Sequence, residues 1–329
     1  MVCACNAQDP APAEPLDGRF NRLFDRAGGG WTGGDGTYSV VLPDGRSVWL
    51  FGDTFLDTVG ADGRRAPGSR LINNSLVVQD GDSLRTLYGG TAAEPAAWLR
   101  PPVADQWYWP LDGFVAGERL YLFFSAFERV GEGIWSFSYT GRDDMAVLRL
   151  PGLELEEVVN VDVSQIAYGA AVMEDAGYIY IYGLEDLSES KFMHLARVGA
   201  ADPKATWQYW VDGAWSADPP RSQRLLEGVS NQYSVLSDGD AYRLITQTYP
   251  FGRDIVEYRA PAPHGPWEGP RLLYTVPDPG GNLYTYNAVA HPQFGDDRGL
   301  LVSYNVNSFV FADLFEDAGI YRPRFVRLF

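Results

Sequence analysis

The sequence predicts an all-β protein folded as a five-bladed β-propeller, and three observations lead to this prediction. Most of the 329 residues fall in short alternating runs broken by Gly, Pro, Asp and Asn, a pattern typical of strands joined by turns. Aromatic residues make up 14% of the chain, and they favour the pleated surfaces of sheets. Five segments also repeat one hairpin pattern, in which two apolar strands flank a turn rich in Gly and Asp.

The repeated hairpins are spaced widely enough to leave room for two more strands in each unit. They begin near residues 35, 110, 167, 231 and 284. Segments 73–81 and 254–274 supply such strands after the first and fourth hairpins. A radial array of about four strands per unit is a propeller, and the main alternative is a β-sandwich with long loops. The C-terminal "GIYRPRFVRLF" is expected to add a closing strand, because an open ring would leave an exposed edge.

Helical patterns are scarce. Only 83–99 and 188–198 are expected to be helical, each for a turn or two. We assign 1–18 as a flexible N-terminal tether and 19–329 as a single propeller domain. No apolar run reaches the roughly 18 residues of a membrane span.

The two cysteines both lie in the first five residues. The stretch "VCAC" resembles a bacterial lipobox, which predicts a lipid anchor at Cys5, although an ordinary disordered N-terminus fits the same residues. The anchor would place the protein in the periplasm or on the extracellular side of the cell surface. The net charge of −17 argues against nucleic acid or anionic lipid as a partner.

The first hairpin, "WTGGDGTYSVVLPDGRSVWLFGDTF", carries an aspartate at each outer end, Asp35 and Asp53. Pro43 suits the first central position of a type I turn and Gly45 the left-handed position that follows. The resulting three-residue loop sets Asp35 directly opposite Asp53, with Cβ atoms about 5 Å apart. A two-residue turn at Asp44 and Gly45 would shift the register by one and point the carboxylates to opposite faces.

Like charges placed opposite each other destabilise a sheet, so this pair should bind a cation or perform acid–base chemistry. The glycines around the aspartates would let a ligand approach the backbone. The other four hairpins lack acids at both ends, so the repeat itself does not require them. The alternative is that both are solvated aspartates at strand ends.

Polar residues at the corresponding strand ends of the later units should converge on one funnel. Asp112 is the best third carboxylate, able to orient substrate or tune a pKa, although it also fits a turn. Trp31 and Trp109 could stack on sugars, although core packing fits them equally well. His291 could line the axis, although a lone histidine is more often a packed, hydrogen-bonded residue. The full set of expected substrate-binding residues is Asp112, Trp31, Trp109, Tyr168, Gln232, Tyr233, Tyr286, Asn287, Asn305 and His291.

The motifs exclude several kinds of site. HExxH, CxxC and clustered histidines are missing from the sequence, which argues against zinc. It also carries no GxSxG elbow and no P-loop. No redox cofactor is implied, whereas a calcium ion on the axis would find abundant oxygen ligands.

The motifs "WTGGDGTYSV", "LPDGRSVWLFGDTF", "NNSLVVQDG" and "YRPRF" resemble a group of bacterial five-bladed propellers of unknown function. That group is similar to endo-D-arabinanases and, more distantly, to furanosidase-type glycoside hydrolase propellers. The resemblance extends from about Gly30 to Phe329. It implies that Asp35 and Asp53 match the paired first-blade aspartates held to be catalytic in those arabinanases. No third catalytic carboxylate can be matched by motif.

These arguments predict an exported glycoside hydrolase that acts on a furanose-containing or related polysaccharide. One aspartate would protonate the leaving oxygen and the other would act as nucleophile or base. A carboxyl separation near 5 Å implies retention of configuration and about 6.5–9.5 Å implies inversion, and direct pairing favours the shorter distance. The alternatives are a non-catalytic, glycan-binding surface lipoprotein and a protein-binding scaffold.

Overall fold

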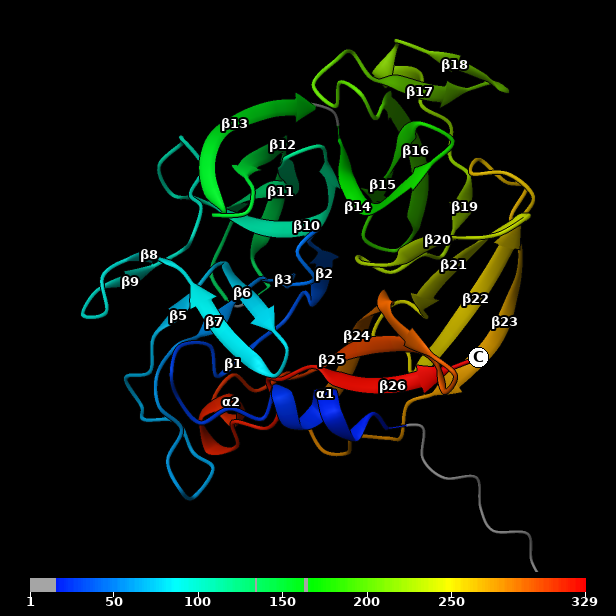
Figure 1. Cartoon of the computed structure of the whole chain (residues 1–329). Helices are drawn as coiled ribbons and strands as arrows, with labels where there is room; N and C mark the ends of the chain where they lie inside the picture. The colour runs from blue at the N-terminus through cyan, green and yellow to red at the C-terminus, as the bar shows by residue number, and fades with distance from the viewer. Residues whose placement is uncertain (1–15, 134, 163–164) are drawn as a thin grey trace, which may run out of the picture.

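The computed structural model describes residues 16–133, 135–162 and 165–329, and most of these residues lie in β-strands. Five sheets surround the centre of the molecule and follow one another in chain order, so the fold is a β-propeller and each sheet is a blade (Figure 1). The first strand of each blade contacts the first strand of the next, and the first blade contacts the fifth. The ring is therefore closed.

The first two blades each contain four antiparallel strands. Blade 1 consists of β2 (Tyr38–Val41), β3 (Ser47–Phe51), β6 (Ser75–Asp80) and β7 (Ser83–Leu87). Small sheets flank it, formed by β1 (Gly33–Gly34), β4 (Thr54–Phe55) and β5 (Leu71–Ile72), and by β8 (Gly89–Gly90) and β9 (Pro95–Ala96). Blade 2 consists of β10 (Gln106–Ala116), β11 (Arg119–Arg129), β12 (Phe137–Arg149) and β13 (Glu154–Asp162).

Blade 3 is the largest sheet, and blade 5 has three strands. Blade 3 consists of β14 (Ile166–Asp175), β15 (Tyr178–Asp186), β16 (Lys191–Gly199), β17 (Gln208–Val211), β18 (Ala214–Ser216) and β19 (Leu226–Glu227). Blade 4 consists of β20 (Ser234–Asp238), β21 (Ala241–Gln247), β22 (Asp254–Ala260) and β23 (Glu268–Thr275). Blade 5 consists of β24 (Leu283–Asp296), β25 (Gly299–Ser308) and β26 (Arg324–Leu328).

The five hairpins expected from the sequence are the first two strands of the five blades. The strands expected in 73–81 and 254–274 are β6, β22 and β23. The expected closing strand is β26, which pairs with β25. These predictions are confirmed, and the described helices are α1 (Gly18–Leu23), α2 (Asp313–Glu316) and a short 3-10 turn (Pro219–Arg221).

The two helical expectations are wrong. Segment 83–99 contains β7, β8 and β9, and most of segment 188–198 is β16. Every residue of Lys191–Gly199 lies in register with β15, from Lys191 opposite Asp186 to Gly199 opposite Tyr178. The neighbouring strand therefore decides the conformation of this segment over its weak local preference.

The core is divided among the spaces between blades. Buried apolar residues form one cluster between each pair of neighbouring blades, and five such clusters complete the circuit. In the cluster between blades 5 and 1, Phe20 and Phe24 of α1 pack with Trp49 and Phe325. This packing holds the helix against the ring. None of the helices in the described part of the chain is long and apolar enough to span a membrane.

Two faces of the ring follow from the hairpins. We call the side with the tight turns between the first two strands, such as 42–46 and 117–118, the turn face. The opposite side, where first strands begin and second strands end, is the open face. Residues preceding β2 and following β3 therefore meet on the open face.

Candidate active site

Asp35 and Asp53 lie opposite each other on the open face. Tyr38 pairs with Leu50 in one ladder, and Gly34 pairs with Thr54 in the next. Both ladders have the same register, and this register places Asp35 opposite Asp53. The three-residue turn expected from Pro43 is present, because Leu42 N donates to Arg46 O at 2.8 Å. The register predicted from the sequence is confirmed. Between the two ladders, Gly52 N donates to Asp35 O at 2.7 Å.

Asp35 is held from blade 5 and from the chain before β26. The Tyr286 hydroxyl donates to Asp35 Oδ2 at 2.7 Å. Asn307 Nδ2 in turn donates to the Tyr286 hydroxyl at 3.4 Å. Burial raises the pKa of Asp35, and hydrogen bonds from the Tyr286 and Tyr321 hydroxyls oppose the rise. Hydroxyl donors favour the ionised form of this carboxyl.

Asp53 is held by N–H donors from blades 1 and 2. Trp109 Nε1 donates to Asp53 Oδ1 at 3.0 Å, and Asn73 Nδ2 donates to the same oxygen at 3.2 Å. Burial and then the negative charge of Asp35 raise the pKa of Asp53 to about 7, against the pull of both hydrogen bonds. The pKa values of both carboxyls are thus raised, and the charge of Asp35 adds to burial in raising that of Asp53.

Two glycines leave room for the pair. A Cβ on Gly52 would lie 2.8 Å from Asp35 Oδ1 and 3.5 Å from Trp109 Cδ1. Gly36 has a positive φ of 69°, and a Cβ there would lie 3.0 Å from Gln232 Nε2 of the chain before β20. Close approach of the Asp35 carboxylate explains Gly52, whereas the positive φ and the nearby Gln232 side chain explain Gly36. The expectation that these glycines let a ligand approach the backbone stays a prediction.

Asp112 bridges blades 2 and 3. It lies where the pairing of β10 with β11 shifts, between Pro110 and Gly113. Its two oxygens accept from Gly113 N at 2.8 Å and Val172 N at 2.9 Å. Burial raises the pKa of Asp112 to about 7. Both oxygens are engaged by the backbone, so this carboxyl primarily fixes the junction of two blades.

The structure brings Trp109, Tyr286 and Gln232 to the aspartate pair through the contacts above. Asn305 lies nearby and is buried, and its Oδ1 accepts from Thr37 Oγ1 at 2.9 Å. Asn287 is also buried, and its Oδ1 accepts from Ser230 Oγ at 3.1 Å. These amides join blade 5 to the chain next to the first strands of blades 1 and 4.

Four other candidates lie in the packed core and do not line a funnel. Trp31, Tyr168, Tyr233 and His291 are each fully buried. The Tyr233 hydroxyl donates to Gly183 O at 3.0 Å, and the Tyr168 hydroxyl to Ser222 Oγ at 2.9 Å. Alternating patterns identify buried positions, but they do not distinguish residues that face the propeller axis from residues that pack between blades. These four residues were therefore wrongly expected to line the funnel.

His291 shows this misplacement most clearly. Its ring lies 4.8 Å from that of Trp49, and its nitrogens lie within hydrogen-bonding distance of Ser39 Oγ at 2.6 Å and Ser303 Oγ at 2.9 Å. Burial lowers the pKa of His291 to about 3. It is a neutral core residue with both nitrogens satisfied.

Two contributors were missed by sequence reasoning. Asn73 stands just before β6, and Tyr321 stands just before β26, both far from the pair along the chain. Their motifs, "NNSLVVQDG" and "YRPRF", carry the family resemblance and the expected strands, but they indicate no role for these two residues at the site. No spacing rule connects either one to Asp35 or Asp53.

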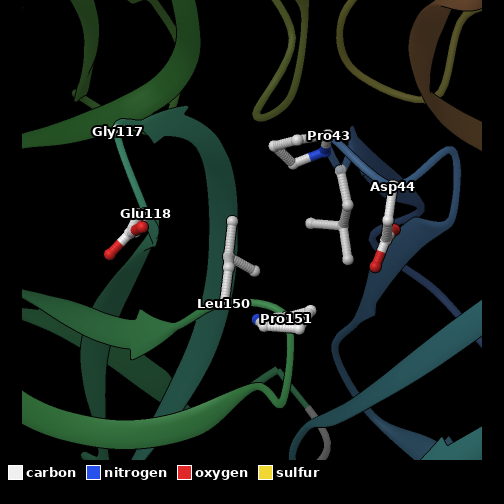
Figure 2. A pocket seen from close by; sticks show the side chains of 7 residues that line it. Pro43, Asp44, Gly117, Glu118, Leu150 and Pro151 are labelled. Carbon is white, nitrogen blue, oxygen red and sulfur yellow. The ribbon is translucent and has the colours of Figure 1, made fainter.

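Two cavities lie near the first two blades. Figure 2 shows one on the turn face, lined by Pro43, Asp44, Gly117 and Glu118 among others, with a volume of about 220 Å³. It is at the opposite end of the hairpin from the aspartates. The second, of about 520 Å³, is lined by β5, β9 and the segment up to Trp107, and includes Asn73. Through Asn73 it adjoins Asp53.

Within the described ranges, no group of three or more His, Cys, Asp or Glu side chains is arranged to hold a metal ion. The calcium ion considered from the sequence stays an untested prediction.

The sequence matches the family described as "Domain of unknown function (DUF5005)" over residues 17–329, so the chain belongs to this family. A search of curated proteins found no match. The structure is similar to that of a protein from Bacteroides ovatus ATCC 8483 described as a "putative hydrolase", with TM-score 0.83 and 25% identity over 95% of this chain and 89% of that one.

A more distant neighbour is a GH43_1 enzyme from Xanthomonas citri complexed with xylotriose. It has TM-score 0.52 and 15% identity, over 93% of this chain and 92% of that one. At this identity the likeness concerns the fold alone. The chain thus has a propeller fold like that of glycoside hydrolases.

Proposed function

We propose that this DUF5005 protein is an exported glycoside hydrolase that cleaves a furanose-containing or related polysaccharide with Asp35 and Asp53. The observation that carries the proposal is the pair of opposed carboxyls on the open face, one with a pKa of about 7. Glycoside hydrolysis uses such a pair, with one carboxyl protonated and the other ionised. The similarity to glycoside hydrolase folds supports the same reading.

The surroundings of the two carboxyls suggest their roles. Asp53 is the general acid, because burial and the charge of Asp35 keep its proton in place near neutral pH. Asp35 is the nucleophile or base, because the hydroxyls of Tyr286 and Tyr321 favour its ionised form. Direct cross-strand pairing favours a short separation, and hence a covalent intermediate and retention of configuration. The anomer first released, followed by proton NMR, would distinguish retention from inversion.

The central test is turnover by variants that keep the shape of each carboxyl. Wild-type protein, Asp35→Asn and Asp53→Asn would be assayed for reducing-sugar release from arabinan, fructan, galactan and xylan. We expect each substitution to lower kcat by about 10²–10⁴-fold, the usual contribution of a positioned proton-transfer group. Asp44→Asn is the matched control, because Asp44 lies on the turn face beside Arg46 and far from the pair.

Two results would contradict the proposal. One is the absence of sugar release by the wild type on every polysaccharide, and the other is near-normal turnover by both active-site variants.

A second function, a surface module that binds glycan without cleaving it, is favoured by one observation. The candidate third carboxylate, Asp112, has both oxygens occupied by backbone donors. Such a module would bind a polysaccharide equally well with Asp35→Asn and would release no sugar. Its lipid anchor would be at Cys5, which lies outside the described residues.

A further inference from the structure

Four aromatic side chains from three blades meet on the open face. We call them the aromatic cluster: Trp135 between β11 and β12, Phe251 between β21 and β22, Tyr284 of β24 and Phe309 after β25. The rings of Phe251 and Phe309 each lie 4.5 Å from that of Tyr284. The ring of Trp135 lies 6.1 Å from both Phe251 and Tyr284.

Three of the four rings are open to solvent. Trp135 is 52% exposed, Phe251 42% and Phe309 50%, whereas Tyr284 lies beneath them at 5%. Val310 and Phe311 extend this surface, at 42% and 43%. Single exposed apolar residues need no explanation, but a contiguous aromatic patch marks a place of interaction.

The aromatic cluster is continuous with the aspartate pair. The ring of Tyr284 lies 5.3 Å from that of Tyr286, whose hydroxyl donates to Asp35 at 2.7 Å. Besides burial, the negative charge of Asp35 raises the pKa of Tyr284, which places the cluster within electrostatic reach of that carboxyl. A ligand chain in contact with Asp35 would meet these rings next.

The charges around the cluster indicate a neutral ligand. Within the described part of the chain, the cations that stack on aromatic rings do so on other rings than these four. The carboxyl in the path described above is that of Asp35, and the whole chain carries a net charge of −17, so the cluster is not built for an anion. Sugar rings combine no charge with apolar C–H faces, and aromatic side chains offer large rigid surfaces to such faces.

We propose that the aromatic cluster binds sugar units of the polysaccharide on the Asp35 side of the cleaved bond. The placement of these sugar units relative to the cleaved bond rests on the proposed function. Binding of glycan by the cluster does not require cleavage. Convergence from three blades would fix the rings in place, so that little ordering entropy is lost when the glycan binds.

The test measures binding separately from turnover. Wild type, Phe251→Ala and Phe309→Ala would be run by affinity electrophoresis in gels containing arabinan, fructan, galactan or xylan. One of these polysaccharides should slow the migration of the wild type through the gel. We expect each variant to bind that polysaccharide about 3- to 10-fold more weakly, in keeping with the contribution of one aromatic contact. Phe329→Ala is the matched control, because this phenylalanine is 76% exposed and stands at the C-terminus, outside the cluster. It should bind like the wild type.

Binding by both variants equal to that of the wild type would overturn the inference, as would no retardation of the wild type in any gel. Sedimentation velocity of the same proteins covers the other occupant of such a surface, a second copy of the chain. A dimer that Phe309→Ala converts to a monomer would overturn the glycan assignment.

If the variants bind polysaccharide more weakly and the wild type releases no sugar, the result would support this inference and refute the hydrolase proposal. Circular dichroism would show whether each variant is folded, and a folded Phe309→Ala alone suffices for the test.

Discussion

Asp35 and Asp53 can be charged together only at a cost, because they face each other across one hairpin and share a partly buried space. Each carboxyl has two donors, but the donors differ: hydroxyls of Tyr286 and Tyr321 for Asp35, and N–H groups of Trp109 and Asn73 for Asp53. The charge of Asp35 adds to burial in raising the pKa of Asp53 to about 7. At the scale of single residues, the pair is therefore set up to hold one proton.

This arrangement predicts the direction of the pH dependence. As the pH rises through about 7, Asp53 loses its proton and can no longer act as an acid, so kcat/KM should fall about tenfold per pH unit above that point. Asp112 also has a pKa of about 7, so Asp112→Asn serves as the control and should keep the same alkaline limb. An alkaline limb that disappears in Asp112→Asn would assign the proton to Asp112 instead.

Part of this chemistry could be predicted from the sequence, because it depends on local rules. Pro43 and Gly45 select the turn, the turn selects the register, and the register brings Asp35 and Asp53 together. Tyr321 and Asn73 could not be predicted in this way. They reach the pair only when distant parts of the chain are folded against blade 1, and nothing in their own spacing records that contact.

At the scale of elements, the short connection between β3 and β4 contains Gly52, whose lack of a side chain leaves room for the Asp35 carboxyl. Gly52→Ala would place a Cβ 2.8 Å from Asp35 Oδ1, closer than ordinary packing permits. We expect kcat/KM to fall at least about tenfold because the carboxyl is displaced from its productive position. Gly68→Ala is the control, since a Cβ at Gly68 meets nothing within 4 Å. Equal kinetics for the two variants would contradict the expectation.

The elements that the sequence failed to predict share a physical cause. Within 188–198, residues with some helical preference become β16 because β15 offers a continuous ladder from Lys191 onward. The strand β7 arises in the same way from pairing with β6, whereas β8 and β9 pair with each other. Strand formation depends on such partners more than helix formation does, so local sequence reports it less well.

At the scale of the whole molecule, the ring depends on contacts between its first and last described segments. Asp17 caps α1 by accepting from Arg19 N and Phe20 N, both at 2.9 Å, and its other oxygen accepts from Arg327 Nε of β26 at 2.8 Å. Burial alone would raise the pKa of Asp17, but these hydrogen bonds and the charge of Arg327 outweigh it and lower the pKa. Its charged form therefore stabilises the fold.

Asp17→Ala should destabilise the protein by about 3–5 kcal/mol, because it leaves Arg327 buried without this partner. A lowered pKa stabilises the fold above the unfolded pKa of about 3.9, and that stabilisation is lost as the pH falls through the folded pKa. The difference in free energy of unfolding should therefore shrink in acid. Urea unfolding at pH 7 and pH 3.5 would measure it. Asp82→Ala, which removes an exposed partner of Arg19, should change stability by at most about 1 kcal/mol.

The propeller itself could be predicted from the sequence because the repeated hairpins became the inner strands of the five blades. The contents of the funnel were harder to predict. Trp31 precedes β1 and His291 lies on β24, and both pack in the space between blades 5 and 1, where an apolar cluster lies. Alternation along a strand assigns each side chain to one of two faces of the sheet. In a propeller both faces pack against neighbouring blades, and only the inner edge of the blade faces the axis, so alternation does not identify the residues that line the funnel.

The glycines of the turn face have a practical use. Gly45, Gly117, Gly177 and Gly239 all adopt positive φ angles, and a Cβ at each would meet nothing within 4 Å. Inserted tags or coupling groups in these turns would project into solvent at the end of the molecule opposite Asp35 and Asp53. Immobilising the protein on a bead or sensor chip through this end would leave its carboxylate pair presented to dissolved polymer.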